Sequence, residues 1–87
     1  MSDINAETEY VRIKIYPPPF CSFKHLDERG WLTMKKGSTL KDALKMIKMP
    51  RAAAKIMLVK LNGLSERWDT VLEDGDVIGF FSFISGG

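Results

Sequence analysis

The sequence predicts an α+β domain in which a mixed sheet of about four to five strands packs on one main helix, Thr39 to Lys48. Three patterns support this prediction. Polar and apolar residues alternate from Tyr10 to Tyr16, as in a half-buried strand. Apolar residues recur at helical spacing from Leu40 to Ile47. A nearly unbroken apolar run, Val77 to Ile84, is typical of a strand at the centre of a sheet.

The composition is that of a globular domain. The 87 residues are 45% hydrophobic and 28% charged, which is too apolar for intrinsic disorder. We expect a domain over residues 10–84, a flexible N-terminus at 1–9 and a flexible tail at 85–87. Met1 to Glu9 lacks the apolar core of a signal peptide, and no apolar run approaches the roughly 18 residues of a membrane span. The single cysteine, Cys21, excludes an internal disulfide, so we expect a cytoplasmic protein.

Two strands are predicted near the start of the chain. The alternation in Tyr10 to Tyr16 sends its odd-numbered apolar residues to one side, and three prolines then end the strand. Phe20 to Arg29 is predicted as an ordered loop. Trp31 to Lys35 follows as a second strand, which can pair with the first as a hairpin.

The main helix carries signals at both ends. Thr39 is a favoured N-cap, and Asp42 can return a hydrogen bond to the Thr39 backbone, as in a capping box. Pro50 is expected to stop the helix, because the residue before a proline avoids the helical region. Arg51 to Lys55 is predicted as a short turn.

The second half of the chain is predicted to add two more strands. The first is Ile56 to Leu61, which ends at a turn formed by Asn62-Gly63. Leu64 to Leu72 is predicted to be irregular, with Trp68 and Val71 filling the core beneath it.

The last strand leads into two glycines. A tight turn at Asp74-Gly75-Asp76 opens the strand Val77 to Ile84, and Gly86-Gly87 ends the sequence. At about 3.3 Å per residue, Ser82 to Gly87 can reach roughly 20 Å from the body of the domain. Glycines have no side chain to clash in a narrow channel.

Charge is distributed unevenly along the chain. Between Lys35 and Lys60, eight Lys and Arg residues accompany one acid, Asp42. Between Ser65 and Asp76, five acids accompany one cation, Arg67. This pattern indicates either a solvated helix face beside acidic turns or a field that orients a partner. The overall charge of +2 is too small to predict nucleic-acid binding.

Two motifs near the C-terminus are specific. Thr70 to Phe81 reads T-V-L-E-D-G-D-V-I-G-F-F, and the sequence ends F-I-S-G-G. With the element order above, these motifs resemble the ubiquitin-like β-grasp fold. Within that fold they resemble the MoaD/ThiS type of sulfur carrier, which comprises the molybdopterin synthase small subunit and the thiamine sulfur carrier.

The resemblance implies a carrier that is not itself an enzyme and binds no cofactor. A ubiquitin-activating-like adenylyltransferase would use ATP to form an acyl-adenylate at the carboxylate of Gly87. Sulfur from a donor would then replace the nucleotide and give a thiocarboxylate. A sulfur-accepting synthase or large subunit would use this sulfur in cofactor biosynthesis, with the molybdopterin type favoured. A tungsten cofactor, a thiazole precursor of thiamine, a tRNA base and another intermediate remain open as acceptors.

The resemblance also implies a partner-binding surface. Ile78 and Phe80 are expected to point into the core and Phe81 outward, onto an apolar patch with a basic border. The partner-binding residues are then expected to be Phe81, Phe83, Ile84, Ser85 and Gly86. The alternative is that loops cover the strand and bury Phe83.

Two other functions stay open. The chain can be a ubiquitin-like modifier conjugated to lysines through Gly87, or a non-covalent β-grasp interaction domain whose glycines are a frayed end. Cys21 and His25 are four residues apart but are predicted to form neither a metal site nor a catalytic pair. Such sites need three or four convergent groups.

Overall fold

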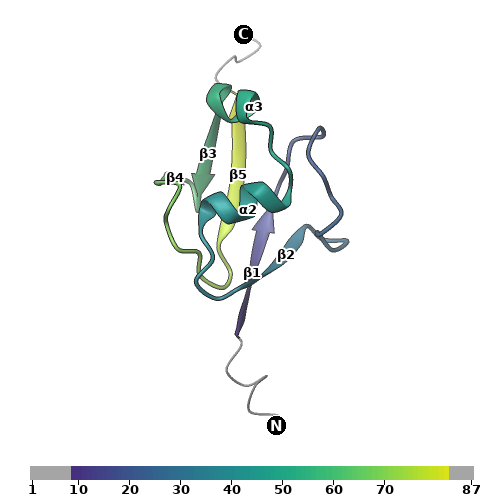
Figure 1. Ribbon diagram of the computed structural model, residues 1–87, viewed down its shortest axis with the longest axis vertical. Coiled ribbons are helices and arrows are strands. Elements are labelled where there is room, and N and C mark those ends of the chain that lie inside the picture. The colour runs from purple at the N-terminus through teal and green to yellow at the C-terminus, as the bar shows by residue number, and fades with distance from the viewer. Residues whose placement is uncertain (1–8, 83–87) are drawn as a thin grey trace.

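The computed structural model describes residues 9–82, which form one sheet and two helices (Figure 1). In chain order the elements are β1 (Tyr10–Ile15), β2 (Trp31–Lys35), α2 (Leu40–Met46), α3 (Arg51–Ile56), β3 (Met57–Leu61), β4 (Leu64–Ser65) and β5 (Val77–Ser82).

The five strands are arranged in the order β2-β1-β5-β3-β4. β1 pairs with β2 antiparallel and with β5 parallel, and β5 pairs with β3 antiparallel. This topology, with α2 across the sheet, is the ubiquitin-like β-grasp fold and confirms the predicted fold class (Figure 1). The last strand lies at the centre of the sheet, as its apolar run predicts.

The core lies between α2 and one face of the sheet. The strand residues predicted to point inward, Val11, Ile13 and Ile15, are buried there. From α2 the core receives Leu40, Ala43 and Leu44, together with Ile47 just beyond the helix. The predicted capping box is also present: the Asp42 amide donates to Thr39 Oγ1, and the Thr39 amide donates to the Asp42 carboxylate.

The main helix is shorter than the predicted Thr39 to Lys48, because it ends at Met46. Lys48 adopts a left-handed backbone with φ of 55°. Its amide donates to the Lys45 carbonyl, and the Met49 amide donates to the Leu44 carbonyl, at 3.0 Å in each case. This pair of bonds is a Schellman motif, so backbone geometry ends the helix before Pro50 is reached.

The predicted turn at Arg51 to Lys55 is wrong, because the backbone there forms α3. Pro50 occupies the N-cap position with an extended backbone, and the residues after it begin with one arginine and three alanines, which favour a helix. Ile56 therefore belongs to α3, and β3 begins at Met57. Across residues 9–82, neither helix has the length and hydropathy that a membrane-spanning helix requires.

The segment after β3 also differs from the prediction. Asn62 and Gly63 both have positive φ, as a two-residue hairpin turn requires. The turn brings the short strand β4 back to pair with β3 at the edge of the sheet. Trp68 and Val71 are not core residues, since both are largely exposed. Leu72 is fully buried in their place.

Candidate functional site

The candidate site is the face of the sheet opposite α2, which we call the outer face. Along each strand, the side chains that alternate with the core residues point to this side. The outer face consists of Arg12, Lys14, Trp31, Thr33, Leu58, Lys60, Val77, Gly79 and Phe81. All of these residues are partly or largely exposed.

The turn at the start of β5 is anchored to β1. The Asp74 carboxylate accepts a hydrogen bond from the Arg12 amide at 2.8 Å, and the Gly75 amide donates to the Arg12 carbonyl at 2.9 Å. Gly75 has a φ of 91°, a conformation that other residues rarely adopt. The predicted Asp-Gly-Asp turn is therefore present, and it sets where β5 begins relative to β1.

The same turn is joined to the end of β3 through Asn62. The Asp76 carboxylate accepts hydrogen bonds from the Glu73 amide at 2.7 Å and from the Asn62 side chain at 2.9 Å. The Asn62 side-chain oxygen in turn accepts from the Val77 amide at 2.8 Å. The first residue of β5 is thus held from both sides, and the strand leading toward the C-terminus has a defined direction.

Phe81 lies on the outer face, as predicted, with 52% of its surface exposed. Its ring lies along the strand over Gly79: a methyl group placed on Gly79 would be 3.2 Å from one ring carbon. Ile78 is fully buried and Phe80 packs against the core, which confirms the prediction that these two residues of β5 point inward and Phe81 points outward. The glycine therefore makes room for the exposed ring.

The outer face is apolar around Phe81 and Leu58 and is basic and aromatic on β1 and β2. Leu58 lies opposite Phe81 in the pairing of β3 with β5 and extends the apolar part. On β1 and β2, the Arg12 guanidinium is 5.0 Å from the centre of the Trp31 ring, and the Lys14 ammonium is 5.6 Å from it. Cations at these distances are attracted to the face of the indole.

Asp27 holds this basic part in place. Its carboxylate accepts hydrogen bonds from the Trp31 and Arg29 amides and forms an ion pair with Arg12 at 3.1 Å. The Trp31 amide is the main cause of a lowered pKa for Asp27, with the Arg29 amide and Arg12 contributing. Asp27 is thus an acid that orders the loop before β2 and orients one of the cations.

Cys21 and His25 lie in different environments. Cys21 is buried in the core, where its sulfur is 3.6 Å from the Met49 sulfur, and burial raises the pKa of its thiol. His25 is exposed. Within residues 9–82, no three His, Cys, Asp or Glu side chains are grouped so as to hold a metal ion.

The remaining predicted site residues lie outside the described part of the chain. They are Phe83, Ile84, Ser85, Gly86 and the candidate reactive residue Gly87. Of the predicted partner-binding set, the structure places Phe81.

Two features of the outer face were not predicted from the sequence. One is the space that Gly79, which has no side chain, leaves for the Phe81 ring, and the other is the stacking of Arg12 on Trp31. The sequence does carry a signal for the Gly79 feature, because a glycine inside a central strand often marks a place where another group comes close to the backbone. The contact between Arg12 and Trp31 could not be predicted without the hairpin register, which pairs Trp31 with Lys14 and places it diagonal to Arg12.

Most of the chain matches a known protein family. The model of the ThiS family matches residues 24–87, a span that includes the Asp-Gly-Asp turn, Phe81 and both terminal glycines. No curated protein gives a significant match.

Two solved structures are similar to this one. The first is assigned as subunit 1 of a molybdopterin converting factor from Pyrococcus furiosus. It is 23% identical, the alignment covers 84% of this chain and 95% of that one, and the TM-score is 0.49. The second is a complex of subunits 1 and 2 of the molybdopterin-converting factor from Helicobacter pylori 26695. It is 20% identical, with 91% and 100% of the chains covered and a TM-score of 0.48.

Proposed function

The chain belongs to the ThiS family, and on that premise we propose that it is a sulfur carrier whose reactive group is the carboxylate of Gly87. One observation supports this proposal above the others. The family match extends through Gly86 and Gly87, and these residues follow the central, doubly anchored strand β5 within five residues of its end.

The chemistry requires an activated carboxylate. A partner adenylyltransferase joins the AMP part of ATP to a carboxylate oxygen of Gly87 and releases pyrophosphate. Sulfur that a donor has released at the oxidation level of hydrosulfide then forms a bond to the carbonyl carbon, and AMP leaves with that oxygen. The product is a thiocarboxylate. A synthase or large subunit transfers its sulfur to the acceptor, and water restores the carboxylate of Gly87. We favour a pterin-type acceptor, because the run Thr70 to Phe81 resembles the molybdopterin-type carriers.

In this proposal the carrier contributes recognition and reach. Ordering two glycines in a partner's channel costs conformational entropy, so the binding energy has to come from the folded body. The outer face supplies an apolar contact at Phe81 and cations at Arg12 and Lys14. A partner with an apolar pocket bordered by acids matches this surface.

The decisive measurement is the intact mass of the protein isolated from its native cells. A carrier is expected to show replacement of one oxygen by sulfur, located by fragmentation at Gly87. Adducts that join Gly87 to lysines of other proteins would instead identify a ubiquitin-like modifier. A chain that a cognate adenylyltransferase and ATP leave unmodified would rule out both functions and favour a non-covalent interaction domain.

A pair of tail variants separates the length of the tail from the need for glycine at its end. Deletion of Gly87 leaves the terminal carboxylate on Gly86, one residue short of the proposed position, and should abolish adenylation. Gly87→Ala keeps a carboxylate at the original position and tests whether the partner's channel admits a methyl group. Full sulfur transfer by the deleted chain is incompatible with the proposal.

A further inference from the structure

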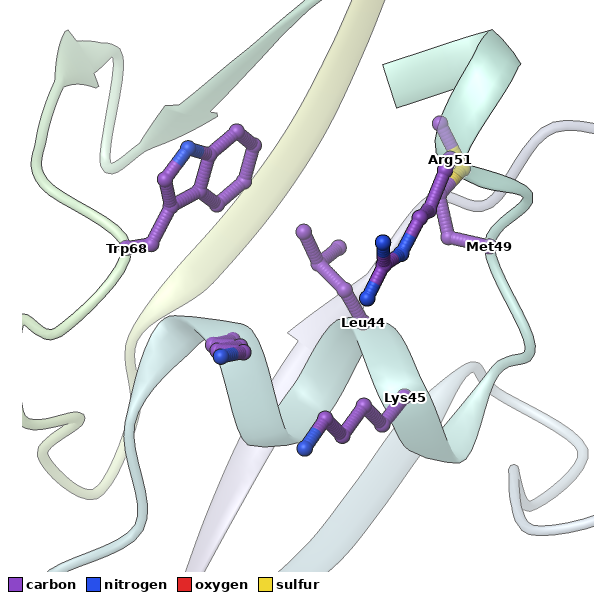
Figure 2. Close-up of a pocket in the computed structure, with 6 residues that line it drawn as sticks. Leu44, Lys45, Met49, Arg51 and Trp68 are labelled. Atoms are coloured by element: carbon purple, nitrogen blue, oxygen red, sulfur yellow. The ribbon is translucent and has the colours of Figure 1, made fainter. Parts of the chain in front are cut away.

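The helix side of the molecule carries a groove that the proposed function does not use. It has a volume of about 390 Å³ and lies between α2, the start of α3 and the segment that follows β4. Its lining consists of Lys41, Leu44, Lys45, Met49, Arg51 and Trp68. Figure 2 shows Leu44 between Trp68 on one side and Met49 and Arg51 on the other.

Backbone hydrogen bonds place Trp68 at this groove. The first amides of a helix have no partner within the helix. In α2, the Lys41 amide donates to the Trp68 carbonyl and the Leu40 amide donates to the Thr70 carbonyl, both at 2.9 Å. The segment that carries Trp68 is therefore held against the first turn of α2, and the indole remains 45% exposed beside it.

The opposite wall is also held by the fold. The Schellman motif at Lys48 directs the chain from α2 to Met49, and the Met49 sulfur contacts the buried Cys21. Arg51 then follows as the first residue of α3. Cys21, which has no role on the outer face, thus helps to position one wall of the groove.

The chemistry of the lining selects a class of ligand. Leu44, Met49 and the Trp68 ring form apolar surface, and the cations come from Lys41, Lys45 and Arg51. Lys, Arg and Trp side chains only donate hydrogen bonds, so no strong side-chain acceptor occurs among these six residues. The three ion pairs formed within residues 9–82 join other residues, and Asp69 near Trp68 is paired with Arg67.

We propose that this groove binds a segment of a partner protein that presents one large apolar side chain flanked by carboxylates. Carboxylates are acceptors only and match a donor-only border, while the apolar side chain packs on Leu44 and Trp68. A nucleotide fits less well, because the donors on its base edge would lie against six described side chains that offer no strong acceptor. The groove and the outer face lie on opposite sides of the sheet, so one carrier can hold two partners at once.

The test is titration of the full ¹⁵N-labelled chain with a short peptide of leucine and phenylalanine among glutamates. We expect shifts of the Lys41, Leu44 and Lys45 amides and of the Trp68 indole N–H. Trp68→Ala and Lys41→Glu should each weaken binding about tenfold. Lys41→Glu is expected to fold normally, since an acid is favourable in the first turn of a helix. The matched control is Lys24→Glu, an exposed loop position outside the groove, which should bind as the parent does.

Three results would overturn the proposal. The first is equal binding of a peptide in which lysines replace the glutamates. The second is shifts at the groove with AMP but none with the acidic peptide, which would identify a nucleotide site. The third is peptide binding that Lys41→Glu leaves unchanged in a chain whose circular dichroism is normal. Adenylation of Gly87 is a separate readout, so failure of this proposal leaves the proposed function standing.

Discussion

Phe81 reaches the outer face because β5 alternates and because its neighbour two residues back has no side chain. With Ile78 and Phe80 directed to the core, Phe81 is directed to the opposite side. Gly79 then leaves space for the ring to lie on the sheet. An exposed aromatic ring of this kind contributes large contact area at little cost in conformational entropy when a partner covers it.

Phe81→Asp should therefore weaken binding to the activating partner at least about tenfold while the domain stays folded. Calorimetric titration measures the affinity, and thermal unfolding checks the fold. Phe23→Asp is the matched control, because Phe23 is 53% exposed and lies in the loop before β2. A Phe81→Asp chain that does not fold would mean that the ring contributes to the core.

At the scale of elements, the bounds of α2 are set by specific backbone interactions at each end. Its N-terminus is closed by the reciprocal bonds of Thr39 and Asp42, and its C-terminus by the left-handed Lys48. A residue with a Cβ is strained in the left-handed conformation, where helices usually place glycine.

Lys48→Gly should raise the free energy of unfolding by about 1 kcal/mol, because glycine adopts this conformation without strain. Urea unfolding measures the change. Lys45→Gly, inside α2, is the control and should lower the free energy of unfolding by about 1 kcal/mol. Destabilisation by Lys48→Gly would show that Lys48 is not left-handed in solution.

The capping box predicts a dependence on pH. Hydrogen bonds from the Thr39 backbone and side chain lower the pKa of Asp42, and Lys45 and Lys41 contribute. Its folded pKa is thus below the unfolded value of about 3.9. The unfolded state therefore binds more protons between the two values. The stabilisation is fully present above the unfolded pKa and is lost as the pH falls through the folded one.

Asp42→Ala should accordingly lower the free energy of unfolding by about 0.3–1 kcal/mol at neutral pH and by less in acid. Urea unfolding at several pH values measures the difference. Asp42→Asn keeps an acceptor oxygen without a titrating group, so its stability relative to Asp42→Ala should not change with pH. A deficit for Asp42→Ala that persists below the folded pKa would contradict this account.

At the scale of the whole molecule, β5 joins the parts of the sheet. It pairs with β1 on one side and with β3 on the other, and its Ile78 is fully buried in the core. The same strand therefore supplies Ile78 to the core and Phe81 to the outer face. A substitution that disrupts β5 should lower global stability as well as partner binding.

Ile78→Ala should lower the free energy of unfolding by about 2–5 kcal/mol, because it removes buried methyl groups and leaves a cavity. Chemical unfolding monitored by circular dichroism measures the loss. Val71→Ala is the control at an exposed position and should change stability by less than about 0.5 kcal/mol. Comparable losses for the two variants would mean that Val71 belongs to the core, as the sequence predicts.

Local patterns determined much of the fold in advance. The alternation in β1, the capping box at Thr39 and the Asp-Gly-Asp turn were all predicted and are confirmed, because each is marked by residues that are neighbours in the sequence. The helix end at Lys48 and the helix α3 were missed. The helix end was missed because Lys48 adopts the left-handed backbone at a position where most helices carry a glycine, and the glycine is what a reader of the sequence would look for.

By itself the sequence determined four of the five strands, the main helix, the outward direction of Phe81 and the terminal Gly86-Gly87 on which the proposed chemistry depends. Only the tertiary structure decided that Cys21 is buried and Trp68 exposed, and that a groove lies opposite the outer face. The physical reason is that residues in irregular segments have no periodic pattern. Their burial depends on which distant elements cover them, and the charged neighbours of Trp68 were the one local sign of its exposure.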